Sequence, residues 1–197
     1  MFPHPQVILA LNQTEIDPLL DKHLWAHVTV RNPDPFPVTV HLWDSPLDRS
    51  TAALGVFKLY AKEQPDQVID VRHIFFSRIV PSDYREYHVE IPQNGEIGKT
   101  HMLVDMLGDF SRLELKDGRY IIRAEGFWRG LWPCGVEEMT KEMVEKSGGW
   151  SQPSLAFKSE GVEIAVDASQ SRGKVPPPPD VFEIPASREY VLGNIAR

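Results

Sequence analysis

Several features that mark common protein classes are scarce in this sequence of 197 residues. Cysteine occurs once, at Cys134, which excludes an intrachain disulfide and a metal cluster built on cysteines. No apolar run approaches the roughly 20 residues that a membrane-spanning helix needs. Residues 1–13 lack the basic start, the apolar stretch and the small-residue cleavage site of a secretion signal. We therefore expect a cytoplasmic protein.

Positive charge is also in short supply. Lys and Arg together number 21 against 28 Asp and Glu, so the net charge is −7, and no run of basic residues stands out. A chain of this charge is repelled by the phosphate backbone of nucleic acids and by anionic lipid surfaces. We expect neither nucleic acid nor a membrane as a partner.

Apolar and polar residues alternate through most of residues 5–168, in short segments separated by Pro, Gly, Asn and Asp. This period of two is typical of β-strands joined by turns. Ten strands are expected, at residues 6–11, 23–31, 38–43, 56–61, 68–76, 87–91, 100–105, 119–125, 155–158 and 162–166. So many short strands at regular spacing predict an all-β fold, an antiparallel β-sandwich of two sheets.

The expected strands 23–31 and 38–43 flank a proline-rich turn, and we expect them to pair as a hairpin because their apolar sets then share one face. The opposite face would carry two tryptophans and two histidines: Trp25, His27, His41 and Trp43. Exposed aromatic surface often marks an interface, so these four are candidate binding residues. The alternative is that another part of the same chain covers this face.

One segment breaks the alternation. Residues 135–146 place apolar side chains at helical spacing, and Ser147-Gly148-Gly149 would end a helix, so a short inserted helix is expected. Aromatic residues flank this helix within an insert of about residues 127–150. Its three tryptophans are further candidate binding residues: Trp128, Trp132 and Trp150. We assign residues 1–168 to the sandwich and residues 169–197 to a Pro-rich C-terminal tail, whose four consecutive prolines favour an extended conformation.

Several motifs occur in an order that resembles a known family. Val28–Asp48 reads VTVRNPDPFPVTVHLWDSPLD: a strand ending in Asn, a turn, an apolar strand and then Trp-Asp-Ser-Pro-Leu. Further along come Ser77-Arg78 with Pro81, Asp83 and Tyr84, then a Pro-Gln-Asn-Gly turn, then Asp105–Glu125 with Phe110, Gly118 and Tyr120. Over residues 5–126 this resembles the immunoglobulin-like domain that precedes the catalytic domain of deuterolysin-type and peptidyl-Lys metalloendopeptidases.

The resemblance implies an immunoglobulin-like β-sandwich that acts as a propeptide or accessory domain, with a metalloprotease as its partner. The His-Glu-x-x-His helix that would hold the catalytic zinc is absent from this sequence. The resemblance therefore does not imply protease activity.

The residues that could form a metal, nucleophilic or acid–base site are mostly better explained by structural roles. His27 and His41 would lie close together across the hairpin, but two surface histidines without a third ligand do not predict a metal site. Cys134 precedes the expected helix, where its pKa could be lowered, although a part-buried inert thiol is favoured. Asp44 and Asp48 could form a carboxylate pair, yet turn capping is favoured. No phosphate-binding glycine motif occurs, and no catalytic residue, metal or cofactor is expected.

Three functions stay open. The first is a non-catalytic binding module whose partner is a protein, either a metalloprotease or a second copy in a homodimer; it predicts a solid surface without a deep cavity or perturbed titrating groups. The second is a small-molecule enzyme with an enclosed pocket in the aromatic insert. That pocket would be lined by Phe127, Trp128, Trp132, Cys134 and Trp150. The third is a structural homo-oligomer that exchanges its tail between subunits.

Overall fold

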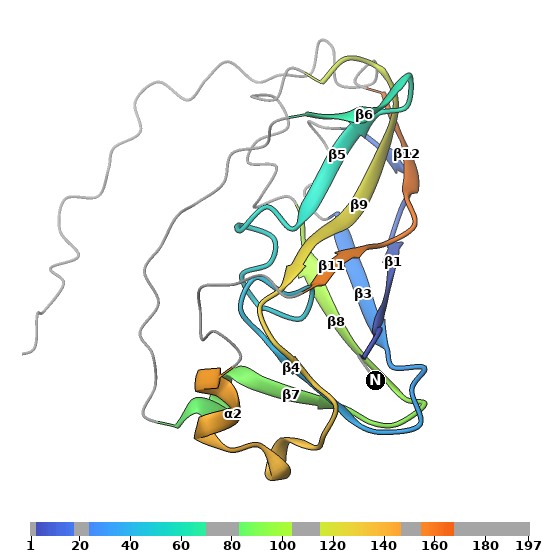
Figure 1. Ribbon diagram of the computed structural model, residues 1–197. Helices are drawn as coiled ribbons and strands as arrows, with labels where there is room; N and C mark the ends of the chain where they lie inside the picture. The colour runs from blue at the N-terminus through green and yellow to red at the C-terminus, as the bar shows by residue number, and fades with distance from the viewer. Residues whose placement is uncertain (1–2, 18–23, 70–82, 104–114, 147–154, 168–197) are drawn as a thin grey trace, which may run out of the picture.

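The computed structural model describes residues 3–17, 24–69, 83–103, 115–146 and 155–167. Within these ranges the chain is built of β-strands with one short α-helix, which confirms the expected all-β fold (Figure 1). The predicted boundary after residue 168 and the predicted tail, residues 169–197, lie outside the described residues. No helix in the described part of the chain combines the length and the apolar character needed to cross a membrane.

The first sheet has three antiparallel strands in the order β1-β3-β8, namely β1 (Gln6–Leu11), β3 (Trp25–Arg31) and β8 (Glu96–Met102). Alternation in the sequence explains its two faces. Ala26, Val28 and Val30 are fully buried, whereas the residues between them are exposed or half-buried. The inner face therefore belongs to the core and the outer face to the surface.

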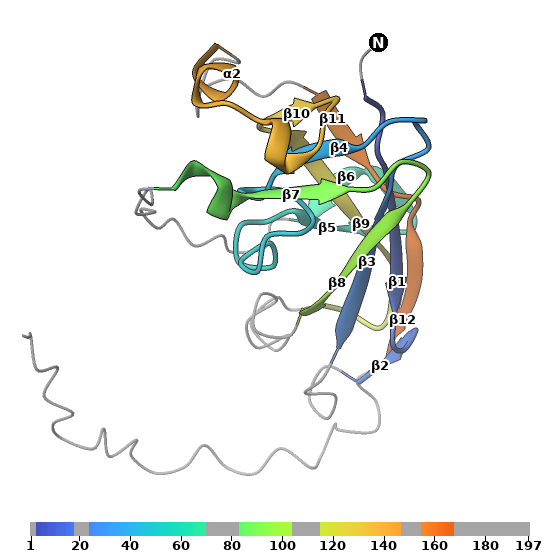
Figure 2. The ribbon, with the colours of Figure 1, turned by 90° about the horizontal axis from the view of Figure 1, so that it is seen from below.

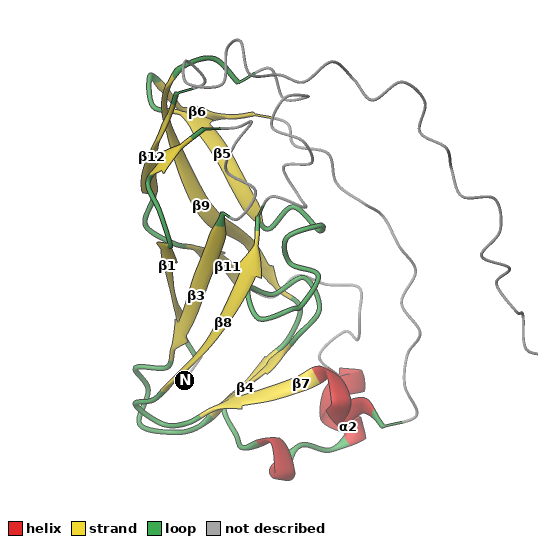
Figure 3. Cartoon of the chain, turned by 180° about the vertical axis from the view of Figure 1, so that it is seen from behind, coloured by secondary structure: helices red, strands yellow, loops and turns green. Residues whose placement is uncertain are grey.

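The second sheet packs against this inner face (Figures 1 and 3). Its strand order is β2-β12-β9-β5-β6, with β11 also pairing with β9. The strands are β2 (Glu15–Ile16), β5 (Phe57–Ala61), β6 (Gln64–Ile69), β9 (Gly118–Trp128), β11 (Leu155–Lys158) and β12 (Val162–Val166). Among the described strands, only β2 and β12 pair in parallel. The long strand β9 joins most of this layer together.

A third, small sheet lies at one end of the sandwich (Figure 2). Its order is β10-β4-β7, with β4 (Val38–His41), β7 (His88–Ile91) and β10 (Leu131–Trp132). The predicted hairpin between residues 23–31 and 38–43 is therefore wrong, because β3 and β4 lie in different sheets. The side chain of Asn32, fully buried after β3, donates to the carbonyls of Phe36 and Pro92 and holds the crossing between the sheets.

The predicted helix over residues 135–146 is only partly confirmed. A 3-10 turn spans Val136–Glu138, and helix α2 covers only Lys141–Lys146. Met139 separates them in an extended conformation and is almost completely buried. Burial of this side chain outweighs the helical spacing of its neighbours. A second 3-10 turn, Tyr84–Tyr87, precedes β7.

Candidate functional site

The loop of residues 42–56, between β4 and β5, forms one wall of the candidate site. The carboxylate of Asp48 accepts hydrogen bonds from the backbone N–H groups of Asp44, at 3.1 Å, and Ser50, at 2.9 Å. The Ser45 hydroxyl oxygen accepts from the N–H of Leu47 at 3.1 Å, and the Thr51 hydroxyl donates to the Ser45 carbonyl at 2.8 Å. These buried bonds confirm turn capping for Asp48 and Ser45 and hold the loop in one shape.

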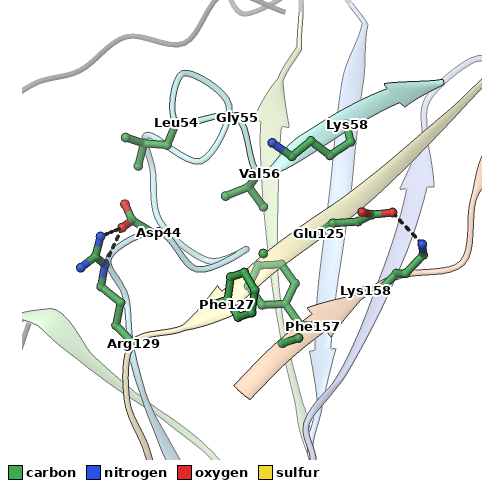
Figure 4. A pocket seen from close by; sticks show the side chains of 12 residues that line it. Asp44, Leu54, Gly55, Val56, Lys58, Glu125, Phe127, Arg129, Phe157 and Lys158 are labelled. Atoms are coloured by element: carbon green, nitrogen blue, oxygen red, sulfur yellow. Dashed lines mark hydrogen bonds and ion pairs between the residues drawn. The ribbon is translucent and has the colours of Figure 1, made fainter. Parts of the chain in front are cut away.

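Between this loop and the end of β9 lies an open cleft of about 710 Å³ (Figure 4). Its apolar lining includes Val56, just before β5, Phe127 on β9 and Phe157 on β11. Phe127 is 56% exposed, the highest value among the large hydrophobic residues described as exposed. An aromatic ring exposed to this extent beside a concave surface is unusual unless something covers it.

Charged side chains surround the apolar part of the cleft. Arg129 forms an ion pair with Asp44 of the loop (Figure 4). Lys158 on β11 lies with its Nζ 3.1 Å from Glu125 Oε1. Lys58 on β5 is a third cation, and no ion pair of Lys58 is found within the described residues. The cleft thus holds three cations against two carboxylates, and both carboxylates already have cationic partners.

Glu125 also organises the neighbouring surface of the same sheet. The Tyr60 hydroxyl donates to Glu125 Oε2 at 2.8 Å, and the guanidinium of Arg123 lies 4.9 Å from the Tyr60 ring centroid. Burial, with the nearby Glu125 carboxylate, raises the pKa of Tyr60 to about 12. Tyr60 is therefore a neutral hydrogen-bond donor at physiological pH.

The backbone of β9 has an open edge in the cleft. The N–H of Glu125 donates to the Val56 carbonyl at 2.8 Å on the β5 side, and the Ala124 carbonyl accepts from Ser159 at 2.9 Å on the other side. Successive residues of a strand direct their N–H and C=O groups to opposite sides. The N–H and C=O of Phe127 therefore point to the β5 side, where no described strand pairs with them because β5 begins at Phe57.

Three of the predicted site residues come together away from this cleft. His41, Trp43 and Trp132 form an aromatic cluster with Tyr87 and His88. The centroid separations are 5.4 Å for His41–Trp43, 5.0 Å for His41–His88, 4.6 Å for Trp43–Tyr87 and 5.0 Å for His88–Trp132. The backbone N–H of Trp43 donates to His41 Nδ1 at 3.2 Å.

This cluster corrects the predicted orientation of His41. We expected it on an outer surface, but it is almost completely buried, because every residue of β4 is covered on both of its faces. His88, its partner across the β4–β7 pair, is buried as well. The cluster therefore contributes to packing at the end of the sandwich, and a binding role for His41, Trp43 and Trp132 stays a prediction.

Trp25 and His27 do lie on an outer surface, as expected, but far from His41 in the fold, on β3 of the first sheet. Trp25 is 37% exposed. His27 Nδ1 lies 3.0 Å from Thr100 Oγ1, and its ring covers Gly98, where an added Cβ would lie 2.9 Å from Nε2. No group of three potential metal ligands occurs among the residues that are described. A binding role for Trp25 and His27 stays a prediction.

Within the described part of the chain, residues expected to line an enclosed pocket for a small-molecule enzyme lie in different environments. Trp128 is fully buried in the core, with its ring centroid 5.0 Å from that of Phe157. Cys134 is half-buried, and burial together with Glu138 and Glu90 raises the pKa of its thiol, which makes it a poor nucleophile. Of the expected lining, the cleft contains only Phe127, and Trp150 lies outside the described residues.

The geometry also matches the binding hypothesis only in part. That hypothesis predicted a solid surface without a deep cavity and without perturbed titrating groups, whereas the structure has an open cleft and a raised pKa at Tyr60. The cleft residues Lys58, Lys158 and Arg129 were missed by sequence reasoning, whereas Phe127 was expected only in the lining of an enclosed pocket in the aromatic insert. One signal was available: the alternation of the expected strand 119–125 continues to residue 128, which places Phe127 on the face opposite Trp128.

Comparison with known proteins gives two findings. A family model described as an immunoglobulin-like domain matches residues 6–166. An uncharacterized secreted protein of Arthroderma benhamiae is 32% identical over 147 residues, which is 73% of this chain and 70% of that protein. The expectation of a cytoplasmic protein is therefore wrong. It rested only on the lack of a recognisable leader in residues 1–13, whereas this relative is described as secreted.

Proposed function

The chain belongs to the immunoglobulin-like domain family, and from that premise we propose that it is a non-catalytic binding module that holds a partner protein in the cleft beside Phe127. The observation that carries this proposal is the exposed Phe127 ring at a concave surface bordered by cations. Covering half of an aromatic side chain contributes on the order of 1 kcal/mol to binding. The rigid loop wall adds to affinity, because little order has to be created on binding.

The chemistry of the cleft also bears on the partner. In a chain of net charge −7, a cleft with an excess of cations favours an acidic surface on the partner. The resemblance over residues 5–126 to domains that accompany metalloendopeptidases makes a deuterolysin-type metalloprotease the first partner that we propose. A second copy of this chain is the other.

The test uses purified protein and such a metalloprotease in a surface-binding measurement. Phe127→Ala should weaken binding by about tenfold or more, as expected for a central aromatic anchor. Ile8→Ala is the matched control, because Ile8 is 40% exposed on β1 of the other sheet. It should leave binding unchanged.

Two outcomes separate the proposed partners. If the protease does not bind, but light scattering shows a dimer that Phe127→Ala dissociates, the partner is a second copy and the binding cleft stands. If Phe127→Ala and Ile8→Ala behave alike in both measurements, the cleft is not the binding site.

A further inference from the structure

We propose that the cleft accepts an extended, acidic segment of the partner, which adds as a short strand to the open edge of β9 at Phe127 and places a carboxylate against Lys58. This inference rests on the proposed function, because it assumes that the cleft is the binding site. It adds the conformation and the charge of the bound segment.

The first support is a gap in strand pairing. On this side of the chain, the last bond to β5 is from the Glu125 N–H to the Val56 carbonyl at 2.8 Å. Pairing resumes where the His41 N–H of β4 donates to the Gly130 carbonyl at 3.1 Å. On this side of β9, residues 126–128 have no described strand beside them, whereas on their other side they pair with β11. An unpaired strand edge of this kind is a template for an added strand.

The second support is that the loop of residues 42–56 is held away from this gap. Its backbone groups are engaged within the loop, for example from Ser45 N to the Leu42 carbonyl at 3.0 Å and from Leu54 N to the Ser50 carbonyl at 3.0 Å. Asp44 and Gly55, near its two ends, have positive φ values of 58° and 72°, which turn the chain out of the strand direction. The loop therefore borders the gap without filling it.

The third support is charge. Arg129 and Lys158 are each paired with a carboxylate of the chain itself, whereas Lys58 is the cation for which the described residues supply no such partner. Lys58 and Phe127 both line the cleft (Figure 4). Lys58 pairs with Arg123 across β5 and β9, so it lies on the same face of the sheet as Phe127. A bound segment would meet both residues with one set of its alternate side chains, and that set should carry the carboxylate.

The probe is a capped pentapeptide of alternating valine and glutamate, titrated into the labelled full chain and followed by the amide resonances of Gly126 and Phe127. A peptide with lysine in place of glutamate should bind at least about tenfold more weakly, because it opposes the cations. Lys58→Gln should weaken binding of the glutamate peptide by about threefold to tenfold. The amide of Ile8 should not respond.

Two N-methylated versions of the glutamate peptide test strand addition. One carries the methyl group on the amide of its central valine, and the other on that of the following glutamate. Only alternate amides of an added strand face its neighbour, so one methylated peptide should lose binding and the other should keep it. If both bind like the parent peptide, or neither binds, the strand-addition inference is wrong.

The two proposals fail in distinguishable ways. If the glutamate peptide leaves the Phe127 amide unchanged while partner binding still depends on the Phe127 side chain, the inference fails and the proposed function stands. If partner binding is indifferent to Phe127→Ala, the proposed function itself fails. Because Phe127 is exposed, its replacement should preserve the dispersed amide spectrum of the folded chain.

Discussion

Stability toward acid should depend on His101, which links β8 to the loop that walls the cleft. His101 is buried, and its Nε2 lies 2.9 Å from the Pro46 carbonyl oxygen. Since a carbonyl can only accept, Nε2 carries the proton and donates it. Burial lowers the pKa of His101 below its usual value of about 6.5; the bond to Pro46 and the charge of Asp48 oppose this shift, and the charge of Lys99 adds to it.

The direction of the pH effect follows from this shift. Below about pH 6.5 the unfolded chain binds a proton at His101 that the folded chain resists. The stability contributed by neutral His101 is therefore complete above that pH and is lost as the pH falls below it. One proton changes the free energy of unfolding by at most about 1.4 kcal/mol per pH unit.

The variant His101→Gln keeps an N–H donor for the Pro46 carbonyl but does not titrate. Urea unfolding of both proteins, followed by tryptophan fluorescence from about pH 7.5 to about pH 5, gives the difference in unfolding free energy at each pH. The carboxylates contribute equally to the pH dependence of both proteins, so their contribution cancels in this difference. As the pH falls below about 6.5, the wild type should lose more stability than the variant, so the difference should change with pH. Parallel curves would refute the reasoning.

Three further predictions concern other described residues. Glu125→Gln should lower the pKa of Tyr60 from about 12, because it removes a carboxylate that raises this pKa; ultraviolet titration of tyrosine measures it. Trp128→Ala should lower the free energy of unfolding by about 3–5 kcal/mol, whereas Trp25→Ala on the surface should cost less than about 1 kcal/mol, as measured in urea. Cys134 should react with a thiol reagent at neutral pH more slowly than free cysteine, and unfolding in urea should remove the difference.

The bounds of a strand were predictable where its side chains alternate between the core and the solvent. In β1, β11 and β12 the expected and observed bounds agree residue for residue, because alternate side chains meet the core and the solvent. Local pattern was sufficient for these three strands. In the turn after β7, Asn94 adopts a positive φ of 50°, as the Asn-Gly pair suggested, but β8 begins at Glu96, before the expected start at residue 100.

Strand partners and helix length were not predictable in the same way. Alternation shows which face of a strand is buried, but not which strand lies beside it, so the sequence could not show that Asn32 carries the chain into another sheet. His41 was placed on the wrong face because β4 is buried on both faces, so alternation along this strand does not show which side chains are exposed. Met139 was assigned to a helix because its spacing from neighbouring apolar residues is helical. In the structure its burial outweighs that spacing, and the residue is extended.

The cleft could not be predicted either, because the sequence does not show which strands lie side by side. Its surface combines the loop of residues 42–56 with β5, β9 and β11, which only the sheet order brings together. Phe127 was named as a pocket residue, and extending the alternation of β9 would have placed it on the outer face. Its open backbone edge could not be predicted, since it depends on where β5 begins and β4 ends.

The central claim is that the partner occupies the cleft and not the outer face of the first sheet. Hydrogen–deuterium exchange of the complex, compared with the free chain, tests this without any substitution. We expect slower exchange in peptides that cover residues 42–56 and 125–129, and no change in those that cover β1 and β3. Protection confined to β1 and β3, around Ile8, Trp25 and His27, would contradict the account.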